Sequence, residues 1–489
     1  MTRRAGLSKS RVAAFEQCAK RLWLQVYRPD VANADQGSHA RFATGHEVGA
    51  IACALIPNGH MIEAEPDLKA ALEETSDLLQ SGFRGPLFEA TLEHDGVLVR
   101  IDILEPNGDD AWSMAEVKSA TRVKDYHLGD LATQVWVARE AGVNINRASI
   151  RHISNEFRLR EEGDYRGLLV EREVSAEIAA VTAGRAAVVC SARAMLDGPE
   201  PSREPGLHCR TPFPCEFEAY CYRDRPEGPQ WPVSILPRGG GKQWEERGIQ
   251  DLLAVDPEAL GSALHQRVHR ATLTGEPFHD CEAAQAAMAS WAYPRTWLDF
   301  ETIAFAVPRW IGTRPYQQTP FQFSAHVEDE HGGVTHYEFL SLDGGDPRRR
   351  CAEALLKLPS SGVVVAYNAA FERGCILDLA DSLPDLAEGL RALAERIVDL
   401  LPVTRACWYH RDQRGSWSIK AVLPTVAPEL DYSNLEIKDG GNAQEAYLEA
   451  IAPETTLERR AQLDVALRAY CERDTEAMIV LARHLAAQA

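Results

Sequence analysis

Residues 97–118, VLVRIDILEPNGDDAWSMAEVK, carry the pattern that decides the fold of the N-terminal half of this chain. Positions 97–104 alternate between apolar and polar side chains as a half-buried strand does, and residues 111–119 are predicted to form its hairpin partner. Side chains two residues apart on a strand point to the same face of the sheet. Glu116 and Lys118 therefore share one face, on which Asp102 can converge with them.

This trio suits the hydrolysis of phosphodiester bonds. Two carboxylates, Asp102 and Glu116, are suitable ligands for Mg²⁺ or Mn²⁺, and Lys118 can orient the attacking water and stabilise charge on a phosphate. The helix expected over residues 125–141 presents Gln134, which could position the water or contact the nucleic-acid backbone. The alternative is that the acids are strand-edge charges and Lys118 is their salt-bridge partner.

Four cysteines form a second constellation. Cys209, Cys215 and Cys221 lie in CRTPFPCEFEAYC with five residues between successive sulfurs, whereas Cys18 lies far upstream. Soft thiolates favour zinc or an iron-sulfur cluster, and four cysteines satisfy either centre. The paired C-x₂-C knuckles typical of zinc are missing, so iron-sulfur is preferred. The alternative is that they are buried core cysteines, a common environment for a free thiol.

The motif Asp102, Glu116-Val117-Lys118 and Gln134 resembles the PD-(D/E)xK nucleases of the RecB-like branch. One cysteine before this motif and three after it resemble the iron-sulfur nucleases related to the AddB helicase-nuclease and the CRISPR-associated RecB-like exonucleases, whose L-S-x-S-R opening matches residues 7–11. The resemblance implies a restriction-endonuclease-like domain whose two ends are stapled by a 4Fe-4S cluster on Cys18, Cys209, Cys215 and Cys221.

Other positions bear on this resemblance. Glu89 stands where these nucleases often carry another acid, Ala138 replaces their usual Tyr, and Gly49 replaces their usual metal-binding His. His46 could substitute only from a different face of its helix. These departures keep open the alternative that catalysis has been lost.

The C-terminal half presents further acids. In the predicted strand RTWLDFETIAF, which begins at residue 295, Asp299 and Glu301 share one face. An apolar run at 363–367 is followed by NAAFE, which places Glu372 in the first turns of a helix. Helical spacing over residues 461–487 puts Tyr470 and Asp474 on one helix face. The alternative is that these acids are solvated strand and helix ends.

The order D-x-E, N-x-x-F-E, Y-x₃-D resembles the DEDD exonucleases of the ribonuclease-H-like fold. It implies two metal ions held by Asp299, Glu301, Glu372 and Asp474, with Tyr470 orienting the nucleophile. Glu372 stands where these enzymes usually have Asp. Residues 308–323 and 415–422 also resemble a bacterial domain of unknown function, and within them the following residues are predicted either to contact phosphate and unpaired bases or to pack in loops: Arg314, Gln317, Gln318, Lys420, Trp310, Tyr316 and Phe321.

Composition sets the frame for these motifs. The 489 residues carry a net charge of −20, so any contact with nucleic acid must be a local basic groove. No apolar run approaches the roughly 18 residues of a membrane span, and the N-terminus lacks a signal-peptide pattern, which predicts a soluble cytoplasmic protein without a membrane partner. The fold class expected is α/β, with a nuclease domain over residues 1–225, a linker and helical connector over 226–290, and a ribonuclease-H-like domain over 291–489.

These expectations together predict a metal-dependent nuclease. It would hydrolyse phosphodiester bonds in DNA, as an exonuclease on single strands or ends, in repair, recombination or defence. The rival is a catalytically degenerate iron-sulfur protein that binds nucleic acid as a scaffold. An iron-sulfur redox protein is disfavoured because no flavin or nicotinamide fingerprint accompanies the cysteines.

Overall fold

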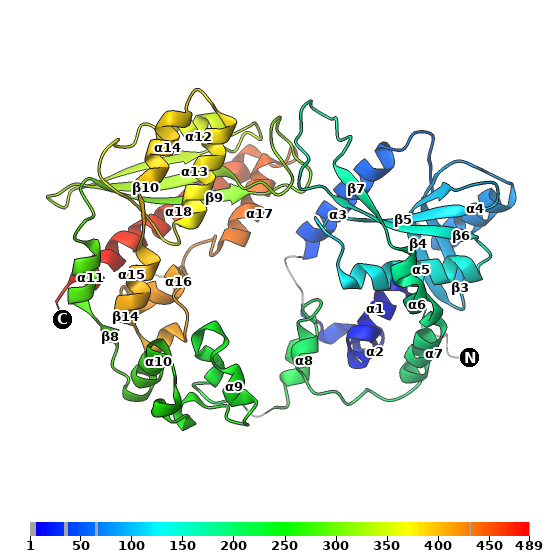
Figure 1. The fold of residues 1–489 in the computed structure, drawn as a ribbon, viewed down its shortest axis with the longest axis horizontal. Helices are drawn as coiled ribbons and strands as arrows, with labels where there is room; N and C mark the ends of the chain where they lie inside the picture. The colour runs from blue at the N-terminus through cyan, green and yellow to red at the C-terminus, as the bar shows by residue number, and fades with distance from the viewer. Residues whose placement is uncertain (1–5, 34–37, 64–66, 226, 431, 489) are drawn as a thin grey trace. The chain divides into compact units, whose positions relative to one another are not determined.

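The chain forms a mixed α/β structure that divides into two compact units (Figure 1). The computed structural model describes residues 6–33, 38–63, 67–225, 227–430 and 432–488. Unit 1 comprises Met1–Arg225 together with Phe305–Tyr316, and unit 2 comprises Pro226–Ala304 with Gln317–Ala489. Residues 305–316, which follow the acidic strand at residues 295–303 of unit 2, therefore belong to unit 1.

Unit 1 is built on a mixed sheet. Its described strands run in the order β2-β3-β4-β5-β6-β7, and β1 pairs with β4. The predicted hairpin is confirmed, since β4 and β5 are antiparallel with Ile103 opposite Ala115. Alternate residues of β4, including Val97, Val99 and Ile101, are fully buried because the pleat turns them all to one face. The strands are β1 (Leu7–Ser8), β2 (His60–Met61), β3 (Leu87–His94), β4 (Val97–Pro106), β5 (Trp112–Lys118), β6 (Ile145–Ile153) and β7 (Leu169–Glu173).

Helices cover the unit 1 sheet. The predicted helix after β5 is confirmed as α5, which packs with α1 and α7 over the main apolar core. Among the described residues no single helix is long and apolar enough to cross a membrane, although the bent pair α6 and α7 meets the length and composition criteria together. The helices are α1 (Lys9–Gln17), α2 (Ala19–Tyr27), α3 (Ser38–Ala54), α4 (Leu68–Gln80), α5 (Asp125–Glu140), α6 (Ser175–Ala183), α7 (Arg185–Leu196) and α8 (Glu218–Tyr222).

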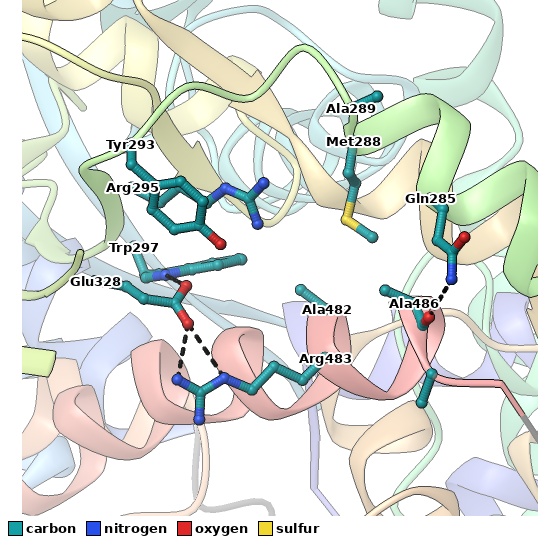
Figure 2. A pocket seen from close by; sticks show the side chains of 11 residues that line it. Gln285, Met288, Ala289, Tyr293, Arg295, Trp297, Glu328, Ala482, Arg483 and Ala486 are labelled. Carbon is teal, nitrogen blue, oxygen red and sulfur yellow. Dashed lines mark hydrogen bonds and ion pairs between the residues drawn. The ribbon is translucent and has the colours of Figure 1, made fainter. Parts of the chain in front are cut away.

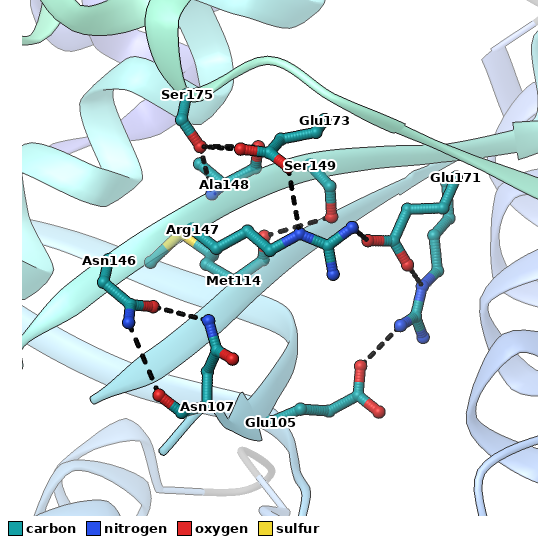
Figure 3. Close-up of polar contacts among 11 residues, drawn as sticks. Glu105, Asn107, Met114, Asn146, Arg147, Ala148, Ser149, Glu171, Glu173 and Ser175 are labelled. Atoms are coloured by element: carbon teal, nitrogen blue, oxygen red, sulfur yellow. Dashed lines mark hydrogen bonds and ion pairs between the residues drawn. The ribbon is translucent and has the colours of Figure 1, made fainter. Parts of the chain in front are cut away.

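A series of ion pairs links strands β4, β6 and β7 of this sheet (Figure 3). Arg147 on β6 contacts Glu171 at 2.8 Å and Glu173 at 3.3 Å, both on β7. Arg151 joins Glu171 at 3.0 Å to Glu105 of β4 at 2.5 Å. Because these pairs span three strands, they add electrostatic support to the register that the backbone sets.

Unit 2 contains a second mixed sheet, with described strands in the order β11-β10-β9-β12-β13. β9 runs antiparallel to β10 and parallel to β12, and the predicted acidic strand is confirmed as β9. β9 is buried along most of its length because helices cover both faces of this sheet. The strands are β9 (Arg295–Ile303), β10 (Thr319–Glu328), β11 (Val334–Leu340), β12 (Val364–Ala366) and β13 (Ile397–Asp399), and a separate pair is formed by β8 (Phe278–His279) and β14 (Trp408–Tyr409).

Two helical layers enclose this sheet (Figure 1). Leu298 and Phe300 pack beneath α12, α13 and α14 on one face, whereas Trp297 belongs to the core that includes α15 and α18 on the other. The predicted C-terminal helix is confirmed as α18. The helices are α9 (Lys242–Glu245), α10 (Ala263–Thr274), α11 (Cys281–Met288), α12 (Arg348–Leu355), α13 (Ala370–Ser382), α14 (Ala387–Glu395), α15 (Leu400–Cys407), α16 (Ile419–Val422), α17 (Gly440–Ile451) and α18 (Leu457–Ala486).

Residues 226–290, expected to be a linker and connector, contribute to the core of unit 2. Trp231, Val233 and Leu236 are buried in the same cluster as Leu400 and Leu481. Residues 233–239 form only short 3-10 turns among their Pro and Gly residues, whereas α10 and α11 confirm the predicted helical part of the connector. The connector is therefore part of unit 2.

Candidate functional site

The predicted acids of unit 1 meet on the β4–β5 hairpin. Glu116 is 2% exposed, and its Oε1 accepts from Lys118 Nζ at 2.8 Å, which confirms that the two share a face. Gln134 Nε2 on α5 donates to Glu116 Oε2 at 2.5 Å, while Asp102 Oδ2 accepts from the Val117 N–H at 2.7 Å. The structure thus brings together the four residues predicted for this site.

The charges of this group are unevenly distributed. Burial and the neighbouring Glu116 raise the pKa of Asp102 to about 7. Burial acts to raise the pKa of Glu116 as well, but Lys9 and Lys118 outweigh it and lower that pKa to about 2. Glu116 is therefore ionised at neutral pH, while Asp102 readily keeps a proton.

Three further residues belong to this group. Lys9 at the start of α1 donates to Glu116 Oε1 at 2.6 Å, and Asp130 on α5 lies 3.2 Å from Lys118 Nζ. Glu89 on β3 has a left-handed φ of 57°, a strained conformation for a residue with a side chain, and its charge helps to raise the pKa of Asp102. Lys9 lies inside the opening LSKSR, so its motif was visible in the sequence, whereas its partner was not.

The departures from the nuclease pattern have different environments. Ala138 is fully buried in the core of unit 1, and His46 is exposed on α3. Gln134 Oε1 is buried without a hydrogen-bond partner among the described residues. The amide of Gln134 is bonded to Glu116 through its nitrogen, so the unpaired oxygen lies within the site and can accept a hydrogen bond.

The four predicted cluster ligands line one small cavity. Cys18 at the end of α1 and Cys209, Cys215 and Cys221 around α8 surround a space of about 10 Å³, room for about one water molecule. None of the four is in a disulfide. No three of these sulfurs lie within 4.8 Å of one another, whereas a tetrahedral zinc with Zn–S of about 2.3 Å would hold them about 3.8 Å apart. The thiolate donor set fits a soft metal centre, but the described cysteines do not form a ready single-ion site.

Protein contacts already join the two ends of unit 1 at this cavity. Gln17 Nε2 donates to the carbonyls of His208 and Phe213 at 2.7 and 2.8 Å, and Arg21 pairs with Glu216 at 2.8 Å. Burial raises the pKa of Cys215 to about 11. A metal centre there would have to displace thiol protons, so its binding would be coupled to pH and to folding.

Three predicted acids of unit 2 form a tight group. Asp299 and Glu301 on β9 and Asp474 on α18 each place a carboxylate oxygen within 4.8 Å of the others. Glu301 and Asp474 are each 7% exposed. The two-residue strand period and the docking of α18 on this face of β9 bring the acids together.

Burial and mutual repulsion perturb these carboxyls. Burial and Asp474 raise the pKa of Glu301 to about 8, although Lys420 acts to lower it. The pKa of Asp299 is raised well above its usual range by burial and by Asp474, Glu301 and Glu372. Such crowding is costly without a cation or bound protons, and a hard divalent cation suits the oxygen-only donor set.

A lysine and two phenols complete the group. Tyr432 donates to Asp474 Oδ1 at 2.5 Å, and Lys420 Nζ donates to Tyr470 Oη at 2.8 Å and to the Lys438 carbonyl. Lys420 also lies 4.8 Å from the ring centre of Tyr470. The sequence pointed to Lys420 and Tyr470, but Tyr432 lies in a segment without a periodic pattern and was missed.

Glu372 is placed differently from the other three. It is 3% exposed on α13, its Oε2 has no hydrogen-bond partner among the described residues, and it is outside the group defined by the 4.8 Å spacing. Burial raises its pKa to about 8. Asp399 caps α15 through the Leu401 N–H at 3.0 Å.

The aromatic residues proposed to stack on bases differ in exposure. Phe321 is fully buried and stacks on Tyr447 with ring centres 4.1 Å apart, so in this structure it packs in the core. Trp310 is 9% exposed, while Tyr316 is 39% exposed and its hydroxyl donates to the Ser119 carbonyl. Of these three residues, Tyr316 is the most exposed.

A pocket of about 380 Å³ opens at the start of β9, between α11 and the end of α18 (Figure 2). Arg295 lies over the ring of Tyr293 at 4.2 Å, and Glu328 joins Trp297 Nε1 to Arg483. None of the predicted site residues lines this pocket.

Comparisons with known proteins match parts of the chain. Residues 296–418 match a family described as "Domain of unknown function (DUF2779)". The "Uncharacterized protein MG366 homolog" of Mycoplasma pneumoniae is 26% identical over 208 residues, which cover 38% of this chain and 31% of the relative. The "Uncharacterized protein MG366" of Mycoplasma genitalium is 24% identical over 205 residues, with the same coverage. The chain thus spans about a third of the length of these relatives, and it is similar over those stretches to proteins whose names state no activity.

Proposed function

We propose that this protein is a metal-dependent nuclease that hydrolyses phosphodiester bonds in DNA, as an exonuclease on single strands or ends. The observation that carries the proposal is the grouping of Asp299, Glu301 and Asp474 within 4.8 Å in a largely buried site. Buried carboxylates that repel one another favour a hard divalent cation, and Mg²⁺ or Mn²⁺ fits the donors. The bound cation would polarise a phosphoryl oxygen as a Lewis acid.

The residues around these acids have complementary roles in the proposal. Tyr432 holds Asp474 by its short hydrogen bond, so that the carboxylate keeps one orientation. Tyr470 orients the attacking water, and Lys420, bonded to its hydroxyl, supplies positive charge toward a phosphate. The five-stranded mixed sheet of unit 2, with two acids on its central strand, supports a ribonuclease-H-like fold.

Unit 1 supplies a second proposed nuclease site on a PD-(D/E)xK fold. Asp102 and Glu116 would hold the cation, and Lys118 would stabilise charge on the phosphate. The unpaired Gln134 Oε1 can accept a hydrogen bond from the attacking water and so orient it. In support, the hairpin that carries these residues is followed by α5, which presents Gln134 to Glu116.

A 4Fe-4S cluster on Cys18, Cys209, Cys215 and Cys221 remains part of the proposal. Its support is that four free thiols from both ends of unit 1 line one cavity. The cluster would hold the ends of the unit together and would not transfer electrons in catalysis. Anaerobic purification tests it: stoichiometric iron and broad absorbance near roughly 400 nm are expected, and the absence of both rejects the cluster.

The nuclease proposal is tested with DNA and RNA, single- and double-stranded, carrying a label at either end. Asp299→Ala and Asp474→Ala should each abolish a divalent-dependent exonuclease activity that survives Glu116→Ala, while exposed Glu454→Ala should behave as wild type. Retention of all activity in both unit 2 variants contradicts the proposal.

A second candidate is a DNA-binding scaffold without catalysis. It is favoured by the position of Glu372, the expected fourth ligand, outside the acidic group. Metal titration separates the two, since Mn²⁺ and DNA binding without cleavage supports the scaffold.

A further inference from the structure

Two histidines and a glutamate gather on the hairpin of unit 2, apart from the acids already described. His326 on β10 and His336 on β11 are paired in register, and their rings stack with centres 4.5 Å apart. Glu472 approaches from α18. One ring nitrogen of each histidine and one oxygen of Glu472 lie within 4.8 Å of one another.

A chain of hydroxyl groups contacts both rings. Thr475 Oγ1 lies 2.9 Å from the Glu472 carbonyl and 2.8 Å from both Ser324 Oγ and His326 Nδ1. When its one proton goes to the Glu472 carbonyl, Thr475 accepts from the other two groups. In that arrangement Ser324 donates to Thr475, and its oxygen accepts from His336 Nε2 at 2.9 Å. The same arrangement makes His326 Nε2 and His336 Nδ1 the ring nitrogens that carry lone pairs for a metal ion.

Nδ1 of His336 faces a carboxylate. It lies 3.7 Å from Glu472 Oε1, so a lone pair on Nδ1 and the carboxylate oxygen can both bind one cation. A charged N–H···O bond is typically about 2.7–2.9 Å long, which is much shorter. Two ligands of a tetrahedral zinc ion, each about 2.1 Å from the metal, lie about 3.4 Å apart, close to the observed separation.

We propose that His326, His336 and Glu472 form a binding site for a borderline-soft divalent transition metal of the zinc class. Two imidazoles and one carboxylate are a recurrent zinc donor set, and they leave a position for water or another ligand. Ser324 and Thr475 are the outer hydrogen-bond partners that orient the rings, as metal-bound histidines require. The ion clamps α18 to the β10–β11 hairpin.

The site is accessible and separate from the proposed nuclease centre. The His336 side chain is 25% exposed and that of Glu472 is 50% exposed, so an ion can enter from solvent. The three ligands share no residue with the group of Asp299, Glu301 and Asp474. In the β9–β10 register His326 lies opposite Trp297, two residues along from the pair Ser324 and Asp299. Zinc binding at the histidines can therefore be measured whether or not the acids support nuclease activity.

Zinc stoichiometry tests the site in the full-length chain with excess Mg²⁺ present to occupy oxygen-only sites. His336→Ala should bind one zinc ion per chain fewer than wild type. Glu472→Gln should bind that zinc at least about 10-fold more weakly, since loss of an outer-shell partner alone typically costs about 10–100-fold. His484→Ala is the matched control, because His484 also lies on α18 and stacks on another histidine, His279, at 5.1 Å. It should retain the wild-type count, and the difference measurement cancels any zinc held by the cysteines.

Glu472→Gln changes a half-exposed side chain, so it keeps the test valid if His336→Ala does not fold. Equal zinc content and equal affinity in wild type and in the folded variants would overturn the proposal.

Discussion

Replacing Glu301 by Gln should stabilise the metal-free protein by an amount that grows with pH. Burial and Asp474 raise the pKa of Glu301 to about 8 from its ordinary value of 4.5. The folded state therefore holds a proton that the unfolded state releases between pH 4.5 and 8, and stability falls as pH rises through this window. Gln cannot ionise, so the variant escapes this loss.

The size of the effect follows from the pKa difference. Each pH unit in the window contributes about 1.36 kcal/mol, so at pH 7 the variant gains at most about 3 kcal/mol over wild type, and near pH 4.5 the gain vanishes. In wild type the proton can also lie on Asp299 or Asp474, which lowers the cost of burying the three acids and makes this value an upper limit. Other raised carboxyls, such as Glu372, remain in both proteins and largely cancel in the difference.

The assay is urea unfolding in the presence of a chelator from pH 5 to 8, with exposed Glu454→Gln as the matched control. Glu454→Gln should track wild type at every pH. Mn²⁺ at about 100 times its Kd should then stabilise wild type by about 2.7 kcal/mol and Glu301→Gln by less, since a ligand has been removed. A difference between wild type and Glu301→Gln that is independent of pH would refute the argument from charge repulsion.

Three other changes probe the remaining features. Lys9→Met removes the 2.6 Å hydrogen bond to Glu116, so the pKa of Glu116 should rise from about 2. In urea unfolding without metal, the free energy of unfolding of unit 1 should fall by about 1.5–3 kcal/mol. An unchanged free energy of unfolding would contradict this expectation. Cys215→Ala should abolish iron binding and destabilise unit 1 but spare unit 2, which proteolysis followed by mass spectrometry can show. Gly415→Ala should lower the melting temperature strongly, because a Cβ there would lie 1.7 Å from the Ile235 carbonyl oxygen and φ is 78°; wild-type melting would show that the connector does not pack at this point.

The spacing of residues along single strands and helices was enough to predict which candidate site residues share a face. A strand turns every second side chain to one face, so the patterns around Glu116 and Asp299 were enough to pair Glu116 with Lys118 and Asp299 with Glu301. A helix aligns residues four apart, which put Tyr470 and Asp474 together. These relations depend only on backbone geometry within one element, so the sequence determines them.

Local patterns do not determine how the connector at residues 226–290 packs. Its helical pattern is confirmed by α10 and α11, but that pattern says nothing about where Trp231 and Leu236 are buried. Residues 305–316 belong to unit 1, which the local sequence pattern likewise does not predict. They are held there by contacts with distant parts of the chain, such as the hydrogen bond from Leu159 N–H to the Thr313 carbonyl at 3.0 Å. Packing of this kind is set by which surfaces complement one another after collapse.

The sequence by itself determined the α/β class, the acidic strands and the choice of candidate ligands, because alternation and helical spacing are properties of consecutive residues. Only the tertiary structure placed Lys9 on Glu116, Tyr432 on Asp474, and two histidines beside Glu472. Those contacts join segments far apart in the chain, and their geometry depends on strand order and helix docking, which no local pattern encodes.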